Sequence, residues 1–317
     1  MRVLSLFDGI SCGYLAFKRA GLSISQYYSS EIDKSAIIIS QENIPDIIQL
    51  GDVRKIRTEN LPEFDIVIGG SPCQNLSRAG DNKGLKGDKS SLFYEYLRIL
   101  NELQYKNKNI FFLLENTVMA SNWQNEISSL LGVQPIKIDS KLVSAQKRER
   151  LYWSNIPNVC QPTDFNVKLK DILTRHECKL IEHQGILIDS RFNEDEKKLI
   201  SVINGEVRIK QATKKGYIVA RDGDGINLSF PKSKTRRGRV ISQKSSTLDC
   251  QCNISVFYNG ILRKLSITEL ERLQTLPDGY TSIIESDTTR KKVLGNAWNV
   301  DTIAHIFKNL KGGNINE

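Results

Sequence analysis

Gly69-Gly70-Ser71-Pro72-Cys73-Gln74 is the stretch from which the fold and the chemistry of this chain are best argued. It follows Asp65-Ile66-Val67-Ile68, an apolar run typical of a buried strand. The glycine pair lets the backbone turn sharply at the strand end, and Pro72 stiffens the turn because its ring fixes φ. Open α/β sheets place their ligands at the carboxyl ends of strands. The stretch therefore predicts that Cys73 is a nucleophile presented on a rigid loop.

The first half of the chain alternates strand-like and helix-like segments, which predicts an α/β fold with a mainly parallel sheet and helices on both faces. The expected strands are residues 2–7, 26–30, 47–50, 65–68, 110–114, 134–138 and 150–153. The expected helices are residues 13–20, 34–42, 92–104 and 122–131.

The character of the sequence changes after about residue 158, where charged residues and turn signals become more frequent. Helices are expected again over residues 266–274, which begin with the capping-box spacing of Ser266 and Glu269, and over 300–310. We therefore expect a first domain of residues 1–157 and a smaller, mostly β or irregular domain of residues 158–245. Residues 246–317 are expected to return to the first domain.

Composition narrows the class of partner. The chain has 317 residues, a net charge of +9 and a pI of about 9.1, which fits a polyanionic partner such as nucleic acid. It has no apolar run of about 18 residues, so no membrane span is expected. Its first residues lack the pattern of a signal peptide. Its six cysteines are scattered, which favours reduced thiols and a cytoplasmic location.

Three expected strand ends carry residues suited to a nucleoside cofactor. Phe7-Asp8-Gly9-Ile10 joins the first strand to its helix, and glycine there permits close approach of a ligand. Glu31 ends the second strand, where doubly wound folds hold a ribose, and Asp52 ends the third, where it could bind an adenine amino group. Taken singly, each residue is equally explained as a turn or a helix cap. A nicotinamide dinucleotide is disfavoured because G-x-G-x-x-G is absent.

Two further segments supply candidate catalytic groups. Glu115 follows the expected apolar strand of residues 110–114, which comes after the strand that leads to Cys73. A partly buried carboxyl group there could act as an acid. In Gln146-Lys147-Arg148-Glu149-Arg150, an extended backbone would put Arg148 and Arg150 on one face, where they suit an anion or a thiolate. The alternatives are a helix cap for Glu115, a solvated charged edge for the arginines and a buried structural thiol for Cys73.

Together these segments resemble the cytosine-5 DNA methyltransferase family of bacteria and phages, with local similarity to the mammalian de novo branch. The similar motifs occur in family order over nearly the whole chain, and they are Leu6 to Gly9, Gly70 to Gln74, Glu115-Asn116 (with Thr117 where the family has valine), Gln146-x-Arg148-x-Arg150, Arg237-Gly238-Arg239 with Ser246-Thr247-Leu248, and Gly295 to Val300. Asn296 differs from the de novo branch, which has arginine there.

The resemblance implies a Rossmann-like S-adenosylmethionine-dependent methyltransferase sheet with a target-recognition domain over residues 158–245. It implies that Cys73 attacks carbon 6 of a flipped-out cytosine, that Glu115 donates to ring nitrogen 3, and that Arg150, helped by Arg148, holds the base carbonyl. The implied cofactor residues are Phe7, Asp8, Gly9, Ile10, Glu31, Ile32, Asp52, Val53, Gly70, Asn296 and Trp298, with Phe7 and Trp298 sandwiching the adenine. S-adenosylhomocysteine would be the product.

The implied partner is double-stranded DNA, with a monomeric enzyme and, if the chain serves restriction-modification, a companion restriction endonuclease. The implied DNA-contacting residues are Gln74, Ser77, Arg78, Arg236, Arg237 and Arg239, and the loop of residues 77–89 is expected to close over the DNA. Two alternatives stay open: a tRNA substrate, as in one branch of the family, and a catalytically inactive DNA-binding paralogue. Metal binding by His176, Cys178 and His183 is disfavoured, because their spacing is not a recognised zinc pattern.

Overall fold

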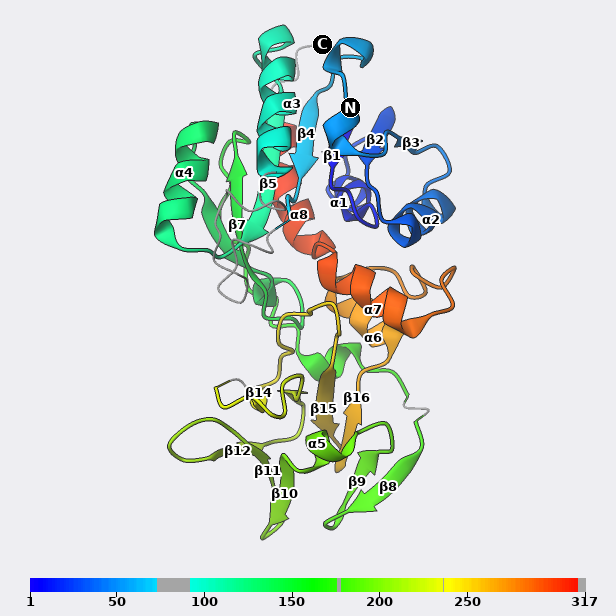
Figure 1. Ribbon diagram of the computed structural model, residues 1–317, viewed down its shortest axis with the longest axis vertical. Helices are drawn as coiled ribbons and strands as arrows, with labels where there is room; N and C mark the ends of the chain where they lie inside the picture. Colours follow the sequence, from blue (N-terminus) through cyan, green and yellow to red (C-terminus); the bar gives the residue numbers. More distant parts are fainter. Residues whose placement is uncertain (73–91, 176–177, 236, 313–317) are drawn as a thin grey trace. The chain divides into compact units, whose positions relative to one another are not determined.

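The computed structural model describes residues 1–72, 92–175, 178–235 and 237–312, and its chain forms two compact units (Figure 1). The first unit comprises Met1–Asp139, Glu149–Pro162 and Ala297–Glu317, and the second comprises Ser140–Arg148 and Thr163–Asn296. Within the described ranges, no helix is both long enough and apolar enough to cross a bilayer.

The first unit contains a seven-stranded sheet in the order β3-β2-β1-β4-β5-β7-β6. Its strands are β1 (Arg2–Leu6), β2 (Gln26–Ser30), β3 (Ile48–Gln49), β4 (Ile66–Gly69), β5 (Phe111–Thr117), β6 (Ile136–Asp139) and β7 (Glu149–Ser154). Strands β1 to β5 run parallel to one another, and β7 is antiparallel to both β5 and β6. The structure thus confirms the predicted α/β class and each predicted strand of this half, with ends shifted by a few residues.

Helices cover both faces of this sheet because alternate strand residues point to opposite sides. The helices are α1 (Cys12–Arg19), α2 (Lys34–Asn43), α3 (Leu92–Lys106), α4 (Ser121–Leu131) and α8 (Val300–Phe307), with short 3₁₀ turns at Val53–Lys55, Thr58–Asn60 and Lys308–Gly312. Leu4, Val67 and Leu114 pack against the apolar side chains of α3, and Figure 1 shows α3 alongside β4 and β5. Helices α1 and α8 pack together, with the rings of Phe17 and Phe307 stacked at 4.1 Å.

The second unit is mostly antiparallel β structure. One sheet has the order β10-β11-β12 and the other β14-β13-β15-β16-β9-β8, in which only the β16–β9 pair is parallel. The strands are β8 (Leu180–His183), β9 (Ile186–Asp189), β10 (Ile200–Ile203), β11 (Glu206–Lys210), β12 (Tyr217–Ala220), β13 (Asp224–Asn227), β14 (Arg239–Ile241), β15 (Ile254–Tyr258) and β16 (Ile261–Lys264). Its helices are α5 (Glu194–Lys197), α6 (Ile267–Leu273) and α7 (Asp287–Asn296), with 3₁₀ turns at Ser140–Leu142 and Leu169–Ile172.

The boundaries of the two compact units differ from the segment boundaries expected from the sequence. Residues 246–296 cluster with the second unit, and only the segment from Ala297 onward clusters with the first. The reason is strand pairing: β15 and β16 complete the sheet that begins with β13, so they belong with the β-rich segment rather than with the parallel sheet. A short excursion, Ser140–Arg148, also joins the second unit.

Candidate active site

The carboxyl ends of β1, β4 and β5 form the edge of the sheet at which the predicted catalytic residues were expected. These strands are neighbours, and the register aligns Leu6 with Gly69 and Gly69 with Leu114. The residues that follow are Phe7, Gly70 and Glu115, so the turn before Cys73 lies beside Glu115 as the sequence predicts. Cys73 itself lies outside the described residues, and so do the predicted DNA contacts Gln74, Ser77, Arg78 and Arg236 and the loop of residues 77–89.

Glu115 is a buried carboxylate with a donor on each oxygen. Its exposed fraction is 8%. The Arg150 Nε lies 2.9 Å from its Oε1, and the indole Nε1 of Trp298 donates to its Oε2 at 3.2 Å. Arg150 comes from β7, whose antiparallel register with β5 pairs it with Thr117, two residues beyond Glu115. The strand ends therefore bring Glu115 and Arg150 into contact, and Trp298 joins them there.

Asn116 holds the loop that leads to Cys73, a role that the sequence did not assign. Its side-chain amide donates to the backbone carbonyl and to the hydroxyl of Ser71, both at 3.2 Å, and both residues are buried. A buried amide with satisfied partners fixes geometry strongly, because an unpaired one is costly. The Glu-Asn pair thus supplies one residue with a carboxyl group and one that anchors the neighbouring turn.

Arg148 lies just before the strand that carries Arg150, and its side chain has partners of its own. Strand β7 begins at Glu149, and within the second unit the buried Arg148 guanidinium donates to the carbonyl of Leu248 at 3.3 Å. Gln146 is buried there too, accepting from the Leu248 N–H and donating to the Leu273 carbonyl. The first part of the Gln-x-Arg-x-Arg motif therefore has a structural role, because its buried polar groups bind main-chain groups of the second unit.

Asp8 supports the turn after β1 from inside the protein. Its carboxylate accepts hydrogen bonds from the hydroxyls of Ser5 at 2.5 Å, Ser11 at 2.5 Å and Tyr27 at 2.7 Å. Burial raises the pKa of Asp8, although the three hydroxyl donors act in the opposite direction. Because these three donors all come from inside the protein, the Asp8 side chain shapes the turn, in which Phe7 and Gly9 both have positive φ.

Glu31 links that turn to the end of β2. Its Oε2 accepts from the Gly9 N–H at 2.8 Å, and its Oε1 accepts from the N–H groups of Ile32 and Asp33. The space around Gly9 is open, since a Cβ there would meet nothing within 4 Å, and the same holds at Gly51. Ile32 is 66% exposed, an apolar side chain beside an open polar edge. A carboxylate, two open glycines and an exposed apolar side chain fit a nucleoside.

Asp52 is ionised and clamped by its neighbour. The side chain of Arg54 donates to both of its oxygens, which lowers the pKa of Asp52 to about 2. Asp52 also caps the 3₁₀ turn that follows, by accepting from the Arg54 N–H. The side chain of Val53 is buried in the core, as is that of Ile10. Any contact of these two with a cofactor is therefore left to their backbone atoms.

The remaining predicted positions lie in the second unit. Asn296 is exposed at the end of α7, and its Oδ1 accepts from the Cys250 thiol at 3.3 Å. Arg239 is exposed at the start of β14, and Arg237 is half-buried two residues earlier. Between them, Gly238 approaches β11 so closely that a Cβ would lie 2.0 Å from the Lys210 carbonyl oxygen. The segment of residues 237–239 therefore packs closely against the three-stranded sheet.

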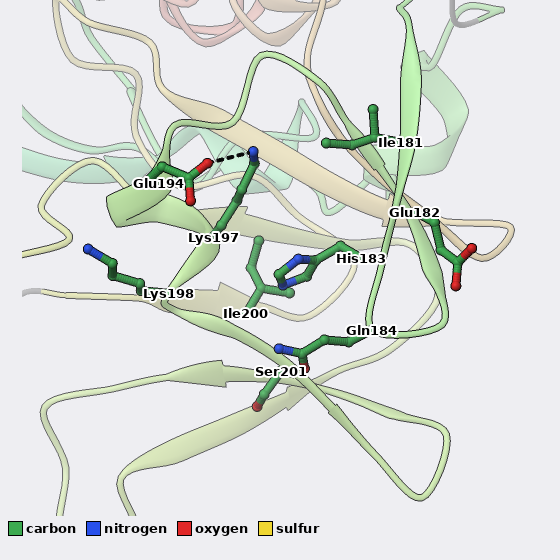
Figure 2. Close-up of a pocket in the computed structure, with 9 residues that line it drawn as sticks. All are labelled: Ile181, Glu182, His183, Gln184, Glu194, Lys197, Lys198, Ile200 and Ser201. Atoms are coloured by element: carbon green, nitrogen blue, oxygen red, sulfur yellow. Dashed lines mark hydrogen bonds and ion pairs between the residues drawn. The ribbon is translucent and has the colours of Figure 1, made fainter.

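A shallow hollow of about 490 Å³ lies between the β8–β9 hairpin, α5 and β10 in the second unit (Figure 2). His183 faces this space, and its Nε2 is buried without a hydrogen-bond partner. Lys197 pairs with Glu194 across the rim at 2.9 Å. Among the described residues, no cluster of three potential metal ligands is present, and His176 lies outside them.

Comparison with known proteins identifies the family. The model of the C-5 cytosine-specific DNA methylase family matches residues 1–131 and 140–312. The type II methyltransferase M.FnuDI of Fusobacterium nucleatum is 28% identical over 98% of this chain and 94% of its own length. The orphan methyltransferase M.SPRI of Bacillus phage SPR is 34% identical over 57% of this chain, but the match spans only 44% of the phage protein.

Solved structures agree on the fold. The Entamoeba histolytica methyltransferase EhMeth has a TM-score of 0.68 at 16% identity, with 98% of each chain covered. The Dnmt2 methyltransferase of S. pombe has a TM-score of 0.64 at 15% identity, covering 99% of this chain and 100% of its own.

The mainly parallel sheet that carries the Glu115–Arg150 ion pair is thus that of a methyltransferase, and the chain belongs to the C-5 cytosine-specific DNA methylase family. Its class is that of the DNA (cytosine-5)-methyltransferases, with DNA as the substrate class and a methyl-donor cofactor. This confirms the resemblance drawn from the motifs.

Proposed function

We propose that this chain transfers a methyl group from S-adenosylmethionine to carbon 5 of a flipped-out cytosine within a specific double-stranded DNA sequence. The observation that carries the proposal is Glu115, a buried carboxylate paired with Arg150 beside the turn that leads to Cys73. A buried acid next to a thiol suits a reaction in which a ring carbon is attacked while charge develops on a ring nitrogen.

In this proposal the chain's own residues divide the reaction between them. The Cys73 thiolate forms a bond to carbon 6 of cytosine, and the displaced ring electrons are stabilised by a proton held at nitrogen 3 by Glu115. Arg150 keeps the Glu115 carboxyl group in place and would bind the base carbonyl. When bound, S-adenosylmethionine supplies the methyl group that carbon 5 takes up. Water then removes the carbon-5 proton, and elimination breaks the carbon–sulfur bond and frees Cys73.

The cofactor proposal rests on the open edge formed by the ends of β1, β2 and β3. Glu31 would hold the ribose hydroxyls, because its carboxylate lies at the end of β2 beside the open Gly9. Asp52 would accept from the adenine amine, since its carboxylate is ionised at neutral pH. Ile32 offers an exposed apolar surface for the adenine ring.

The DNA contacts are proposed on charge. Residues 158–245 would form the target-recognition domain, in which the segment from Lys232 to Arg239 meets phosphates. The enzyme would act as a monomer in the cytoplasm. If it belongs to a restriction-modification pair, as the name of M.FnuDI suggests for that relative, a companion endonuclease would cut the same site.

Bisulfite sequencing of the expression host's DNA tests this proposal. We expect methylated cytosines in a recurring sequence context in cells that make the wild-type protein, and none with the Cys73→Ala variant. Unmodified host DNA in cells with folded wild-type protein would refute the DNA activity. The same treatment of the host's RNA separates the tRNA alternative, in which only RNA cytosines would be protected.

A further inference from the structure

We infer that Trp298 is a positioning residue that holds the Glu115 carboxyl group ready for the base, in addition to any stacking against a cofactor. The inference rests on the proposed role of Glu115. Its basis is the hydrogen bond from the Trp298 Nε1 to the Glu115 Oε2 at 3.2 Å. Stacking of Trp298 on a cofactor would not require this hydrogen bond.

The two donors on Glu115 act from different sides of the site. Arg150 binds Oε1 from β7, whereas Trp298 binds Oε2 from the segment that precedes α8. With one donor on each oxygen, the carboxyl plane cannot rotate without breaking a hydrogen bond in a buried setting. An indole nitrogen only donates, while each carboxylate oxygen has a second lone pair, so Oε2 keeps capacity for a base.

Gly70 shows that this contact is built closely onto the loop before Cys73. A Cβ on Gly70 would lie 2.9 Å from the Trp298 Nε1 and 3.2 Å from the Glu115 Oε2. The first distance is shorter than real Cβ contacts allow, so only glycine lets the backbone lie against both groups. The Gly70 backbone, the Trp298 indole and the Glu115 carboxyl group are therefore packed directly against one another. A displacement of the indole would displace the carboxyl group.

The backbone on either side of Trp298 is firmly held. Asn299 follows directly and caps α8 by accepting from the Thr302 N–H at 3.1 Å, and both residues are buried. On the other edge of the ring, the Trp298 Cζ3 lies 3.8 Å from the Cβ position of Gly13 in α1. The indole thus reaches from the helix behind the cofactor loop to the end of β5. This position suits a residue that connects the proposed cofactor-binding residues with the proposed base-binding residue Glu115.

Trp298→Phe separates positioning from stacking, because phenylalanine keeps an aromatic ring but has no N–H. We expect its affinity for S-adenosylmethionine, measured by calorimetry, to stay within about two-fold of wild type, while the single-turnover methylation rate falls by about ten-fold or more. The rate is measured with radiolabelled S-adenosylmethionine and genomic DNA from a strain that lacks cytosine-5 methylation. Trp123→Phe, a partly buried tryptophan in α4, is the matched control and should keep the wild-type rate.

Gly70→Ala provides a second variant, which keeps the Trp298 side chain intact but pushes its indole nitrogen away from Glu115. It should slow the single turnover as well, and both variants must first show a wild-type circular dichroism spectrum. A Trp298→Phe enzyme that methylates at the wild-type rate would overturn the inference while leaving the proposed function intact. Loss of cofactor affinity with an unchanged single-turnover rate at saturation would also overturn it, in favour of stacking alone. A wild-type enzyme without methylation would instead refute the proposed function.

Discussion

Replacing Arg150 with alanine should destabilise the first unit as well as stop the chemistry. The ion pair with Glu115 spans 2.9 Å, and the two side chains are only 13% and 11% exposed. Removing one partner of such a pair leaves an uncompensated buried charge, which costs about 3–5 kcal/mol. Because Trp298 still donates to the carboxylate, we expect the lower end of this range, about 3 kcal/mol. The double variant with Glu115→Gln leaves no buried charge, so it should recover about 1–2 kcal/mol.

Urea unfolding followed by tryptophan fluorescence measures this effect selectively. The three tryptophans, Trp123, Trp153 and Trp298, all lie in the first unit, so their emission reports on that unit. The control is Arg54→Ala, which removes an exposed arginine paired with Asp52 and should shift the urea midpoint little. An unchanged midpoint for Arg150→Ala would refute the reasoning. So would a double variant whose destabilisation equals the sum of the two single variants.

Three further outcomes are expected. Gly13→Ala should cost about 1–3 kcal/mol by the same fluorescence assay, because its Cβ would lie 2.5 Å from the Ile68 Cδ1; an unaltered midpoint would contradict this packing. Burial alone would raise the pKa of Glu269, but two hydrogen bonds from Arg263 hold it below its ordinary value. The ionised Glu269 therefore stabilises the fold above pH 4.5, and this contribution is lost as pH falls through the lower pKa of the folded protein. Stability followed by circular dichroism should therefore fall less on acidification in Glu269→Gln than in the wild type. Equal losses of stability in the two proteins would contradict this role of Glu269. Asp52→Asn should weaken S-adenosylmethionine binding equally at about pH 5 and pH 8, since the carboxylate pKa is about 2; calorimetry showing no loss at pH 5 would exclude an ionised role.

The parallel sheet could be predicted from sequence because its signals are local. Short apolar runs identify β1, β4 and β5, and the strand order then follows the usual doubly wound pattern around them. Ser266 with Glu269 likewise predicts the start of α6, where the structure has the full capping box. Helix α7 was not predicted, because its Asp-Thr-Thr-Arg-Lys-Lys start has no apolar stripe.

The candidate site was only partly predictable, since its contacts join distant residues. Glu115 and Arg150 were both proposed from their motifs, but their contact depends on β5–β7 pairing. The Trp298 hydrogen bond spans 183 residues, and no local pattern encodes it. The inward direction of Asp8 depends on Tyr27, in the neighbouring strand. The partner of Arg148 was unpredictable for a similar reason, because its acceptor, the Leu248 carbonyl, lies 100 residues away.

The discontinuous first unit has a consequence for the order of folding. Its last segment follows the entire second unit in the chain, yet it supplies α8 for packing against α1 and Trp298 for Glu115. A nascent chain therefore contains the proposed nucleophile Cys73 and the proposed acid Glu115 long before Trp298, the second of the two residues that bind the Glu115 carboxyl group. Closing so long a loop is slow, since contacts of high sequence separation must wait for the intervening chain. Premature termination anywhere in the second unit would leave a sheet without its final helix, so only a chain translated through α8 can assemble the finished site.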